Sequence, residues 1–301
     1  MTALRRAACL LAAVVLLAAG CAGTGRNGSG VVVTTNILGD VTRNVVGDEA
    51  GVTVLMKPDS DPHSFGVSAR QAALIEQAGL VVSNGLGLEE GVLRNVRAAE
   101  DAGVPVLAVG ERVDPLRLTG GQPDPHFWTD PQRVAEAADL IAERVIAEVD
   151  GVDAAAVRAN AAAYRKRLGE LDTWMGGQFA AIPPDRRNLV TNHHVFGYLA
   201  RRHGFTVIGA VIPGGTTLAS PSASDLRSLA DAIRRAKARA IFTDSSQPDR
   251  LAQVLASEAG LNVRIVPLFA ESLSLRAPGA STYLDMMRTN TKAMVDGLNG
   301  R

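Results

Sequence analysis

Cysteine is almost absent from this 301-residue chain, and its two cysteines, Cys9 and Cys21, both lie near the N-terminus. The rest of the sequence therefore offers no disulfide framework and no thiolate metal site. The formal net charge is zero, since 31 basic side chains balance 31 acidic ones. Without a basic stripe the sequence gives no reason to expect binding to nucleic acid. Aromatic residues make up only 4% of the chain, so we expect an aliphatic core.

No membrane-spanning helix is expected at the N-terminus, because the apolar run at 7–19 is shorter than the roughly 20 residues that a span needs. A basic start before this run and small residues after it are typical of an export signal. The ending Leu-Ala-Ala-Gly-Cys at 17–21 resembles a bacterial lipobox, with Ala18 where leucine is commoner, and implies lipidation of Cys21. The alternative is an ordinary secretory signal with a coincidental cysteine. We therefore expect an export signal at 1–21 and a flexible Gly/Ser/Asn-rich tether at 22–30.

Short apolar runs alternate with amphipathic stretches from residue 31 onward. This alternation predicts an α/β fold with mainly parallel sheets flanked by helices. We expect strands at 31–35, 52–56, 81–83, 106–109, 189–191, 206–211, 240–243 and 263–266. We expect helices at 38–46, 69–78, 89–102, 131–149, 195–202, 223–236, 248–259 and 283–298. Asp130 and Ser222 precede two of these helices and are expected to be their N-caps.

One segment, at 153–179, interrupts this alternation. It is rich in Ala, Arg and Leu and contains no proline, which predicts one continuous helix about 40 Å long. Pro183 and Pro184 follow its end. We expect an N-terminal lobe at 31–150, a linking helix at 151–182 and a C-terminal lobe at 183–301. A rigid helix between two lobes fits a cleft that moves little.

Three of the five histidines follow predicted strands or lie in loops, which is where ligands bind in open α/β sheets. His63 and His126 both end an Asp-Pro-His sequence, and His193 follows the strand at 189–191. Proline restricts the backbone on both sides of its peptide bond, so each loop holds its histidine in a defined direction. The carboxylates of Asp61 and Asp124 could accept from the other ring nitrogen or from backbone N–H groups. The alternative is that both are coincidental surface loops.

The spacing of these histidines is too wide for a local motif such as His-Glu-x-x-His. A site that uses all three must be assembled by the fold, with two histidines from the first lobe and one from the second. Three neutral imidazoles suit zinc. They also bind other late first-row metals, including copper.

Several segments resemble those of the zinc- and manganese-specific solute-binding proteins of bacterial ABC transporters. The resemblance covers about 31–298 and implies two α/β lobes joined by a long backbone helix. It also implies an exported monomer, lipid-anchored to the outer face of the cell membrane, that delivers a metal ion to a membrane permease. The segments are Asp-Pro-His-Ser-Phe at 61–65, Asp-Pro-His-Phe-Trp-Thr-Asp-Pro at 124–131, Thr-Asn-His-His-Val-Phe-Gly-Tyr-Leu at 191–199, Ser-Pro-Ser at 220–222 and Leu-Phe-Ala-Glu-Ser-Leu at 268–273.

The resemblance places metal ligands on His63, His126 and His193, and the fourth ligand on Glu271. The fourth position is usually Asp in this family, so Glu271 is a departure. Asp244 is the alternative for that position. His194 stands where relatives often have Asp, and it is an alternative ligand, a helix cap or a residue that lines the cleft. Three histidines favour zinc, with manganese as the alternative, because manganese prefers more oxygen ligands. The region 116–123 lacks the histidine-rich loop that zinc members often carry.

Other functions fit the residues less well. A closed shell of three histidines and one carboxylate leaves no position for water, so we expect binding without catalysis. A zinc hydrolase would need a general base beside an open position, and Ser245 lacks a nucleophile elbow. A surface adhesin would leave the histidines unexplained, and a binder of metal chelates would need a wide pocket with Arg or aromatic walls. Metal affinity should fall below about pH 6.5, where imidazole takes up a proton.

Overall fold

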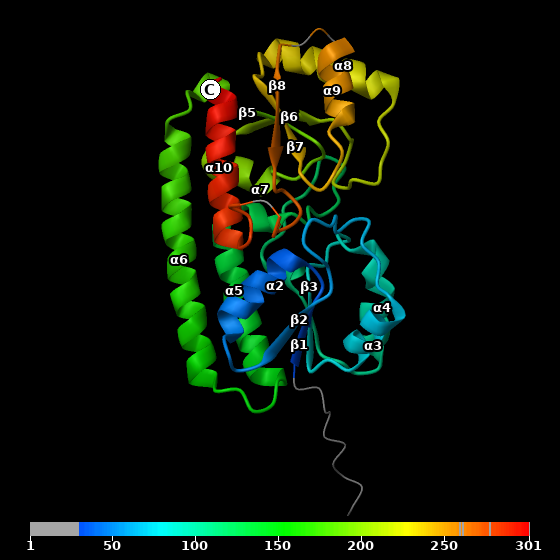
Figure 1. The fold of residues 1–301 in the computed structure, drawn as a ribbon, viewed down its shortest axis with the longest axis vertical. Coiled ribbons are helices and arrows are strands. Elements are labelled where there is room, and N and C mark those ends of the chain that lie inside the picture. The colour runs from blue at the N-terminus through cyan, green and yellow to red at the C-terminus, as the bar shows by residue number, and fades with distance from the viewer. Residues whose placement is uncertain (1–29, 259, 261, 277, 301) are drawn as a thin grey trace, which may run out of the picture.

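The structure is a computed structural model that describes residues 30–258, 260, 262–276 and 278–300 (Figure 1). The expected export signal at 1–21, its Cys21 and the tether up to residue 29 lie outside the described residues. Within the described part, none of the helices combines the length and the apolar character that crossing a bilayer requires.

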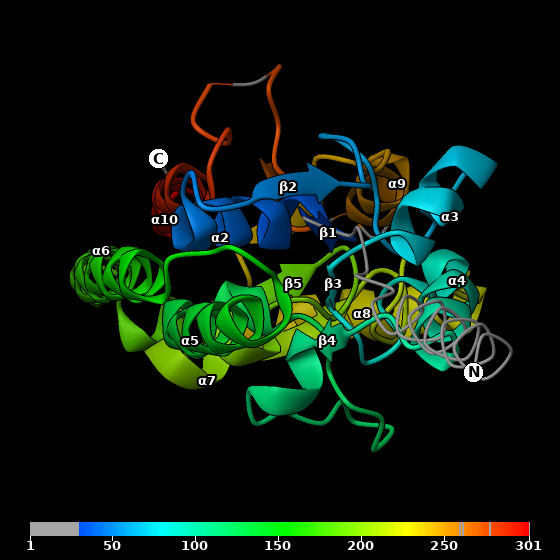
Figure 2. The ribbon, with the colours of Figure 1, turned by 90° about the horizontal axis from the view of Figure 1, so that it is seen from below.

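The N-terminal lobe is built on a four-stranded parallel sheet in the order β2-β1-β3-β4. Alternate residues of its central strands face opposite sides, so Val31 and Val33 join one core cluster while Val32 joins another. Helices α2 and α5 cover the first face, and α3 and α4 cover the second (Figure 2). The strands are β1 (Gly30–Val33), β2 (Gly51–Val54), β3 (Leu80–Ser83) and β4 (Val106–Ala108), and the helices are α2 (Asn36–Val46), α3 (Ala69–Glu76), α4 (Glu90–Asp101) and α5 (Pro131–Glu148).

The C-terminal lobe repeats this topology. Its four parallel strands follow the order β6-β5-β7-β8, which is the same pattern of neighbours as in the first lobe, although the two halves show no close sequence repeat. The carboxyl ends of the two sheets face each other across the middle of the molecule (Figure 1). The strands are β5 (Asn188–Thr191), β6 (Thr206–Ala210), β7 (Ala240–Asp244) and β8 (Arg264–Leu268), and the helices are α7 (Gly197–His203), α8 (Ala223–Ala236), α9 (Arg250–Glu258) and α10 (Tyr283–Asn299).

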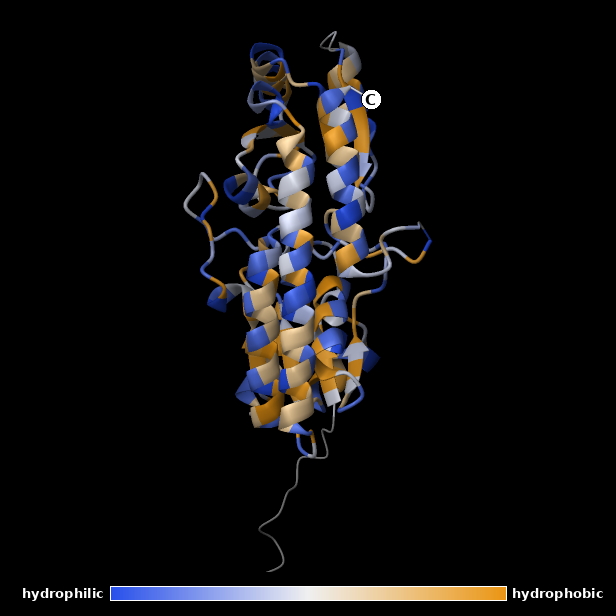
Figure 3. Cartoon of the chain, turned by 90° about the vertical axis from the view of Figure 1, so that its left-hand side faces the viewer, coloured by the Kyte–Doolittle hydropathy of each residue, from blue (hydrophilic) through white to orange (hydrophobic). Residues whose placement is uncertain are grey.

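A single 27-residue helix, α6 (Ala154–Ala180), runs beside both lobes. It packs against α2 and α5 along one half and against α10 along the other (Figure 3). Its N-cap is Asp153, whose carboxylate accepts from the N–H groups of Ala155 and Ala156. The buried positions recur every three or four residues and form one stripe. They are Val157, Ala161, Tyr164, Leu168, Leu171, Met175 and Phe179.

The predicted fold class is confirmed, and every predicted strand and helix after residue 30 is present, most of them with ends shifted by a few residues. Asp130 is the N-cap of α5, and Ser222 forms a capping box with Asp225 at the start of α8. The helix expected from residue 195 begins only at Gly197. The chain between β5 and α7 is instead held in a turn, where the Thr191 hydroxyl donates to the carbonyl of His193 over 2.6 Å. That turn keeps His193 out of the helix.

Candidate metal site

Four side chains predicted from the sequence meet between the lobes. His63 lies between β2 and α3, His126 precedes the short helix at 127–129, His193 follows β5, and Glu271 follows β8. One ligand atom from each lies within 4.8 Å of the others. The exposed fractions are 4% for His63, 0% for His126, 0% for His193 and 1% for Glu271. Both lobes therefore contribute donors to one buried cluster.

The spacing of these donor atoms suits a small cation. Nε2 of His63 and Nε2 of His126 are 3.4 Å apart, and Nε2 of His193 is 2.9 Å from a carboxylate oxygen of Glu271. The Glu271 carboxylate is 3.6 Å from Nε2 of His126 and 3.9 Å from that of His63. A tetrahedral ion with ligands at 2.0–2.1 Å has donors separated by about 3.3–3.4 Å. The observed separations lie around this value.

Hydrogen bonds do not account for these buried donors. Among the described residues, both ring nitrogens of His193 and both carboxylate oxygens of Glu271 lack a hydrogen-bond partner. Buried polar atoms are nearly always paired, because an unpaired one costs about 1–3 kcal/mol. A bound cation would supply the missing partner for several of them at once.

Burial and mutual repulsion keep two of the imidazoles neutral. Burial, with nearby His126 and His193, lowers the pKa of His63 to about 2, and burial also lowers the pKa of His193 well below its usual value. Burial raises the pKa of Glu271 to about 8. Burial alone would lower the pKa of His126, but the carboxylates of Glu271 and Asp124 outweigh it and raise this pKa. Near neutral pH, the His126–Glu271 pair of the metal-free protein therefore holds a proton.

The two Asp-Pro-His loops use their carboxylates differently. Oδ1 of Asp124 accepts from the backbone N–H of His126 at 3.0 Å and lies 2.7 Å from Nδ1 of its ring. This contact fixes the ring and leaves Nε2 facing the cluster.

Oδ1 of Asp61 accepts from the backbone N–H of His63 at 3.0 Å, while Oδ2 accepts from Thr217 and Gln247. Asp124 thus makes the predicted contact with the ring of its histidine. Asp61 instead makes the alternative contact, with the backbone N–H of its histidine.

Asp244, the alternative fourth ligand, lies outside the four-donor cluster. Its Oδ2 accepts from the N–H groups of Ala270 at 3.1 Å and Glu271 at 3.0 Å. Its Oδ1 accepts from both the N–H and the hydroxyl of Ser246. Burial raises the pKa of Asp244 to about 6. Asp244 therefore fixes the backbone that presents the Glu271 side chain.

His194 also lies outside the cluster and is half-buried. Its backbone N–H donates to the carbonyl of Gly214 at 3.0 Å. The expected helix cap is wrong, because Phe196 is the N-cap of α7 and no side chain caps that helix. The turn between β5 and α7 separates His194 from the first residue of the helix.

Three supporting residues escaped the sequence analysis or gave only a weak signal. The indole N–H of Trp128 donates to the carbonyl of Ala270 at 2.9 Å, and the Trp128 ring lies 5.3 Å from that of His126. The side-chain amide of Asn84 donates to the carbonyl of Pro125 at 3.0 Å. The Tyr198 hydroxyl donates to the carbonyl of Asp124 at 2.8 Å. Two weak signals in the sequence could have indicated these roles. Asn84 comes just after a predicted strand, and Trp128 and Tyr198 lie within the segments that resemble the transporter family.

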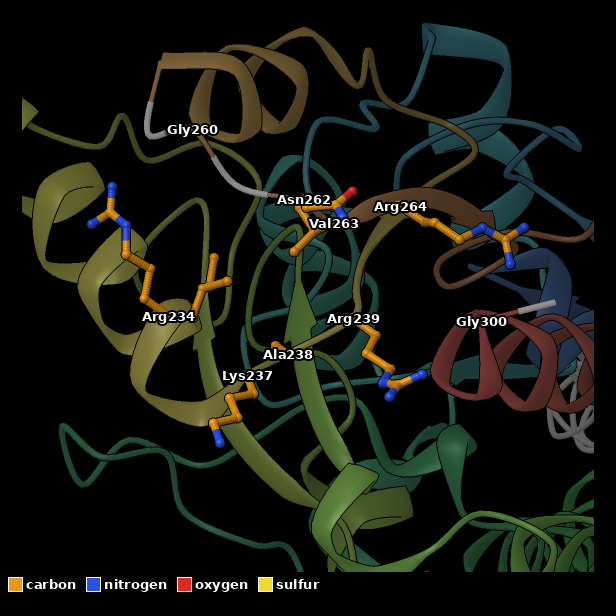
Figure 4. A pocket seen from close by; sticks show the side chains of 10 residues that line it. Arg234, Lys237, Ala238, Arg239, Gly260, Asn262, Val263, Arg264 and Gly300 are labelled. Carbon is orange, nitrogen blue, oxygen red and sulfur yellow. The ribbon is translucent and has the colours of Figure 1, made fainter.

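A separate hollow of about 580 Å³ lies at the amino ends of β7 and β8, away from the four-donor cluster (Figure 4). Its basic side chains do not converge on one point. Lys237 points away from Arg239 and Arg264 (Figure 4). Nη1 of Arg264 donates to the carbonyl of Asp296 in the last turn of α10 at 3.3 Å. This arrangement stabilises a helix end and does not form the converging basic wall that a metal chelate would need.

The fold and the cluster together define a class of protein: two similar α/β lobes braced by one long helix, with a buried cluster of three histidines and one glutamate to which both lobes contribute. The chain belongs to the family described as zinc-uptake complex component A, periplasmic, whose sequence profile matches residues 31–297.

Relatives of known name agree over most of the chain. The manganese-binding lipoprotein MntA of Halalkalibacterium halodurans is 29% identical over 294 residues, which cover 95% of this chain and 96% of MntA. The periplasmic zinc-binding protein TroA of Treponema pallidum has a solved structure that matches with a TM-score of 0.83 and 28% identity, over 90% of this chain and 99% of TroA. The Mn-bound periplasmic metal-binding protein of Candidatus Liberibacter asiaticus matches with a TM-score of 0.77 and 26% identity, over 89% and 99%. These relatives are named as binding proteins and not as enzymes.

The contact between Asp124 and the His126 ring leads to a first prediction. In Asp124→Asn, we expect metal affinity to fall about 10–100-fold, because a neutral amide orients and polarises the imidazole less well than a carboxylate. Competition titration against a chromophoric chelator measures the change. Asp114→Asn is the matched control, since the side chain of Asp114 is 78% exposed and pairs with Arg133 on the surface. Equal affinity in Asp124→Asn and the control would contradict the orienting role.

Proposed function

We propose that this protein captures zinc outside the cell in the cleft between its lobes and delivers it to the permease of an ABC importer. The observation that carries this proposal is the buried set of four donor side chains from both lobes, in which both ring nitrogens of His193 and both carboxylate oxygens of Glu271 have no hydrogen-bond partner among the described residues. In this proposal His63, His126, His193 and Glu271 are the metal ligands. The zinc ion is the transported cargo, so the site must bind it and later release it.

The choice of zinc rests on the chemistry of the donors. Three imidazoles and one carboxylate suit a four-coordinate zinc ion, whereas manganese prefers sites with more oxygen ligands. The relatives do not decide between them, since MntA is named as manganese-binding and TroA as zinc-binding. Manganese capture by the same four residues is the alternative within this family.

Catalysis and adhesion have less support. A zinc hydrolase needs an open coordination position for water, whereas here four buried donors lie at tetrahedral spacing. A purely adhesive protein would have no use for donors that are buried between its lobes. We also propose a monomer that Cys21 anchors to the outer face of the cell membrane, with lobes at 31–150 and 183–301 and the linking helix at 151–182.

Metal analysis tests the proposal. The chain without its export signal and lipidated cysteine is purified, its metal content is measured, and zinc and manganese are titrated in competition. We expect one zinc ion per chain and tighter binding of zinc than of manganese. Preferential retention of manganese would overturn the choice of metal, and no stoichiometric metal with no thermal stabilisation by any divalent ion would overturn the site itself.

A further inference from the structure

Asp61 connects a proposed metal ligand to the opposite lobe. One of its carboxylate oxygens accepts from the backbone N–H of His63, two residues away in the N-terminal lobe. The other accepts from the Thr217 hydroxyl at 2.6 Å and from the Gln247 side-chain amide at 2.9 Å, both in the C-terminal lobe. Asp61 is only 7% exposed. A buried carboxylate with donors from both lobes is stabilised by them only while the lobes are together.

On the opposite side of the cleft, several hydrogen bonds hold the two lobes together. They join the segment that carries Glu271 to the N-terminal lobe. Oδ1 of Asn36 accepts from the N–H of Leu273 at 2.9 Å, and its Nδ2 donates to the Ser272 hydroxyl at 2.8 Å. The Trp128 indole and the N–H of Asp59 also donate to this segment. Loss of any one of these bonds would leave the others in place.

The loops that follow β6 and β7 make fewer hydrogen bonds to the N-terminal lobe, and these bonds share one acceptor. In the part of the chain that the structure describes, every hydrogen bond from the loops at 211–222 and 245–249 to the N-terminal lobe ends on Asp61. An opening motion of these loops breaks two hydrogen bonds to the N-terminal lobe, those from Thr217 and Gln247, and separates Gly215 from the Leu118 side chain. The same motion removes two of the three donors to Asp61, and its remaining bond holds the loop of His63.

We propose that Asp61 is a positioning residue that couples metal retention to lobe closure, acting as a latch with Thr217 and Gln247. The proposal rests on the proposed function, since it concerns retention of the metal at that site. With the latch closed, the His63 loop and the C-terminal lobe are held by one carboxylate, so the ligands of both lobes stay together. With the latch open, the loops at 211–222 and 245–249 separate from the His63 loop, and the metal can leave the cleft on this side.

The test places substitutions on the C-terminal side of the latch, which leaves Asp61 and the four proposed ligands unchanged. Thr217→Val and Gln247→Met remove the donors at nearly constant size, singly and together. The matched control is Thr216→Val in the same loop, because the Thr216 hydroxyl accepts from the N–H of Leu218 and does not reach the other lobe. The rate of zinc loss into excess chelator is measured on the chain without its export signal.

We expect each latch variant to lose zinc about tenfold faster than the unmodified chain, because each substitution removes one hydrogen bond to a charged carboxylate. The control should release zinc at the unmodified rate. The visible spectrum of the cobalt-substituted protein should be the same in all variants, because the ligands are untouched. Spin labels at Arg94→Cys on α4 and Ser228→Cys on α8 should show a broader inter-lobe distance in the double latch variant.

The outcomes separate the two proposals. If the unmodified chain binds no divalent metal, the proposed function fails and the latch fails with it. If the unmodified chain binds zinc and the double variant releases it at the unmodified rate with an unchanged label distance, the latch alone is overturned. A changed cobalt spectrum would also overturn it, because the loops would then be shaping the ligand geometry directly.

Discussion

Replacing His126 by alanine is expected to abolish stoichiometric zinc binding, with affinity falling by more than about 100-fold. The residue is fully buried, and its Nε2 lies 3.4 Å from that of His63 and 3.6 Å from the Glu271 carboxylate. Removing this imidazole leaves three donors and a buried gap, whereas loss of an outer partner alone costs only about 10–100-fold. Metal content after gel filtration and competition titration measure the effect.

His194→Ala is the matched control for this prediction. His194 is adjacent in sequence to His193 but is half-buried and outside the four-donor cluster. We expect this variant to keep one zinc ion per chain with affinity within a few-fold of the unmodified protein. If His194→Ala lost zinc and His126→Ala kept it, the assignment of ligands from the structure would be wrong. Circular dichroism of both variants verifies that the fold is intact.

Zinc affinity of the unmodified protein is expected to rise with pH up to about 8. Burial raises the pKa of Glu271 to about 8, so below that pH its carboxyl group carries a proton that zinc must displace. Displacement of one proton makes affinity fall about tenfold for each pH unit below the pKa. His63 adds nothing to this dependence near neutrality, since its pKa is lowered to about 2. The proton held by the His126–Glu271 pair therefore limits the affinity near neutral pH, in place of an ordinary imidazole that titrates near pH 6.5.

Glu271→Gln isolates this proton. Glutamine keeps the size of the side chain but has no carboxyl proton to lose, so we expect zinc affinity to fall by more than about 100-fold and its dependence on pH to flatten. Calorimetry in buffers of different ionisation enthalpy counts the protons released on binding. We expect about one proton for the unmodified chain at pH 7 and fewer for Glu271→Gln. Equal proton release from both would assign the proton to His126 or another group.

The sequence predicted the parts of the fold that neighbouring residues control. Apolar runs and amphipathic stretches located the strands and helices after residue 30, and Asp130 and Ser222 marked two helix starts correctly. The proline-free stretch after Asp153 predicted α6 nearly to its ends. These features are local, because capping, periodicity and proline act within a few residues.

The choice between Glu271 and Asp244 depended on tertiary structure. Both residues follow neighbouring parallel strands, with Asp244 paired to Leu268 in register, so spacing alone could not decide which carboxylate joins the histidines. In the fold the carboxylate of Asp244 turns to the backbone N–H groups of Ala270 and Glu271. This leaves the side chain of Glu271 to reach the cluster.

The sequence by itself determined the two-lobed α/β class, the long helix and the Asp-Pro-His loops that aim His63 and His126. Only the tertiary structure decided that Asp124 holds a ring while Asp61 reaches the opposite lobe. Only the tertiary structure also decided how far burial moves the pKa of Glu271. The physical reason is distance along the chain: the two Asp-Pro-His sequences are identical, but the donors from Thr217 and Gln247 that bind Asp61 come from segments more than a hundred residues away.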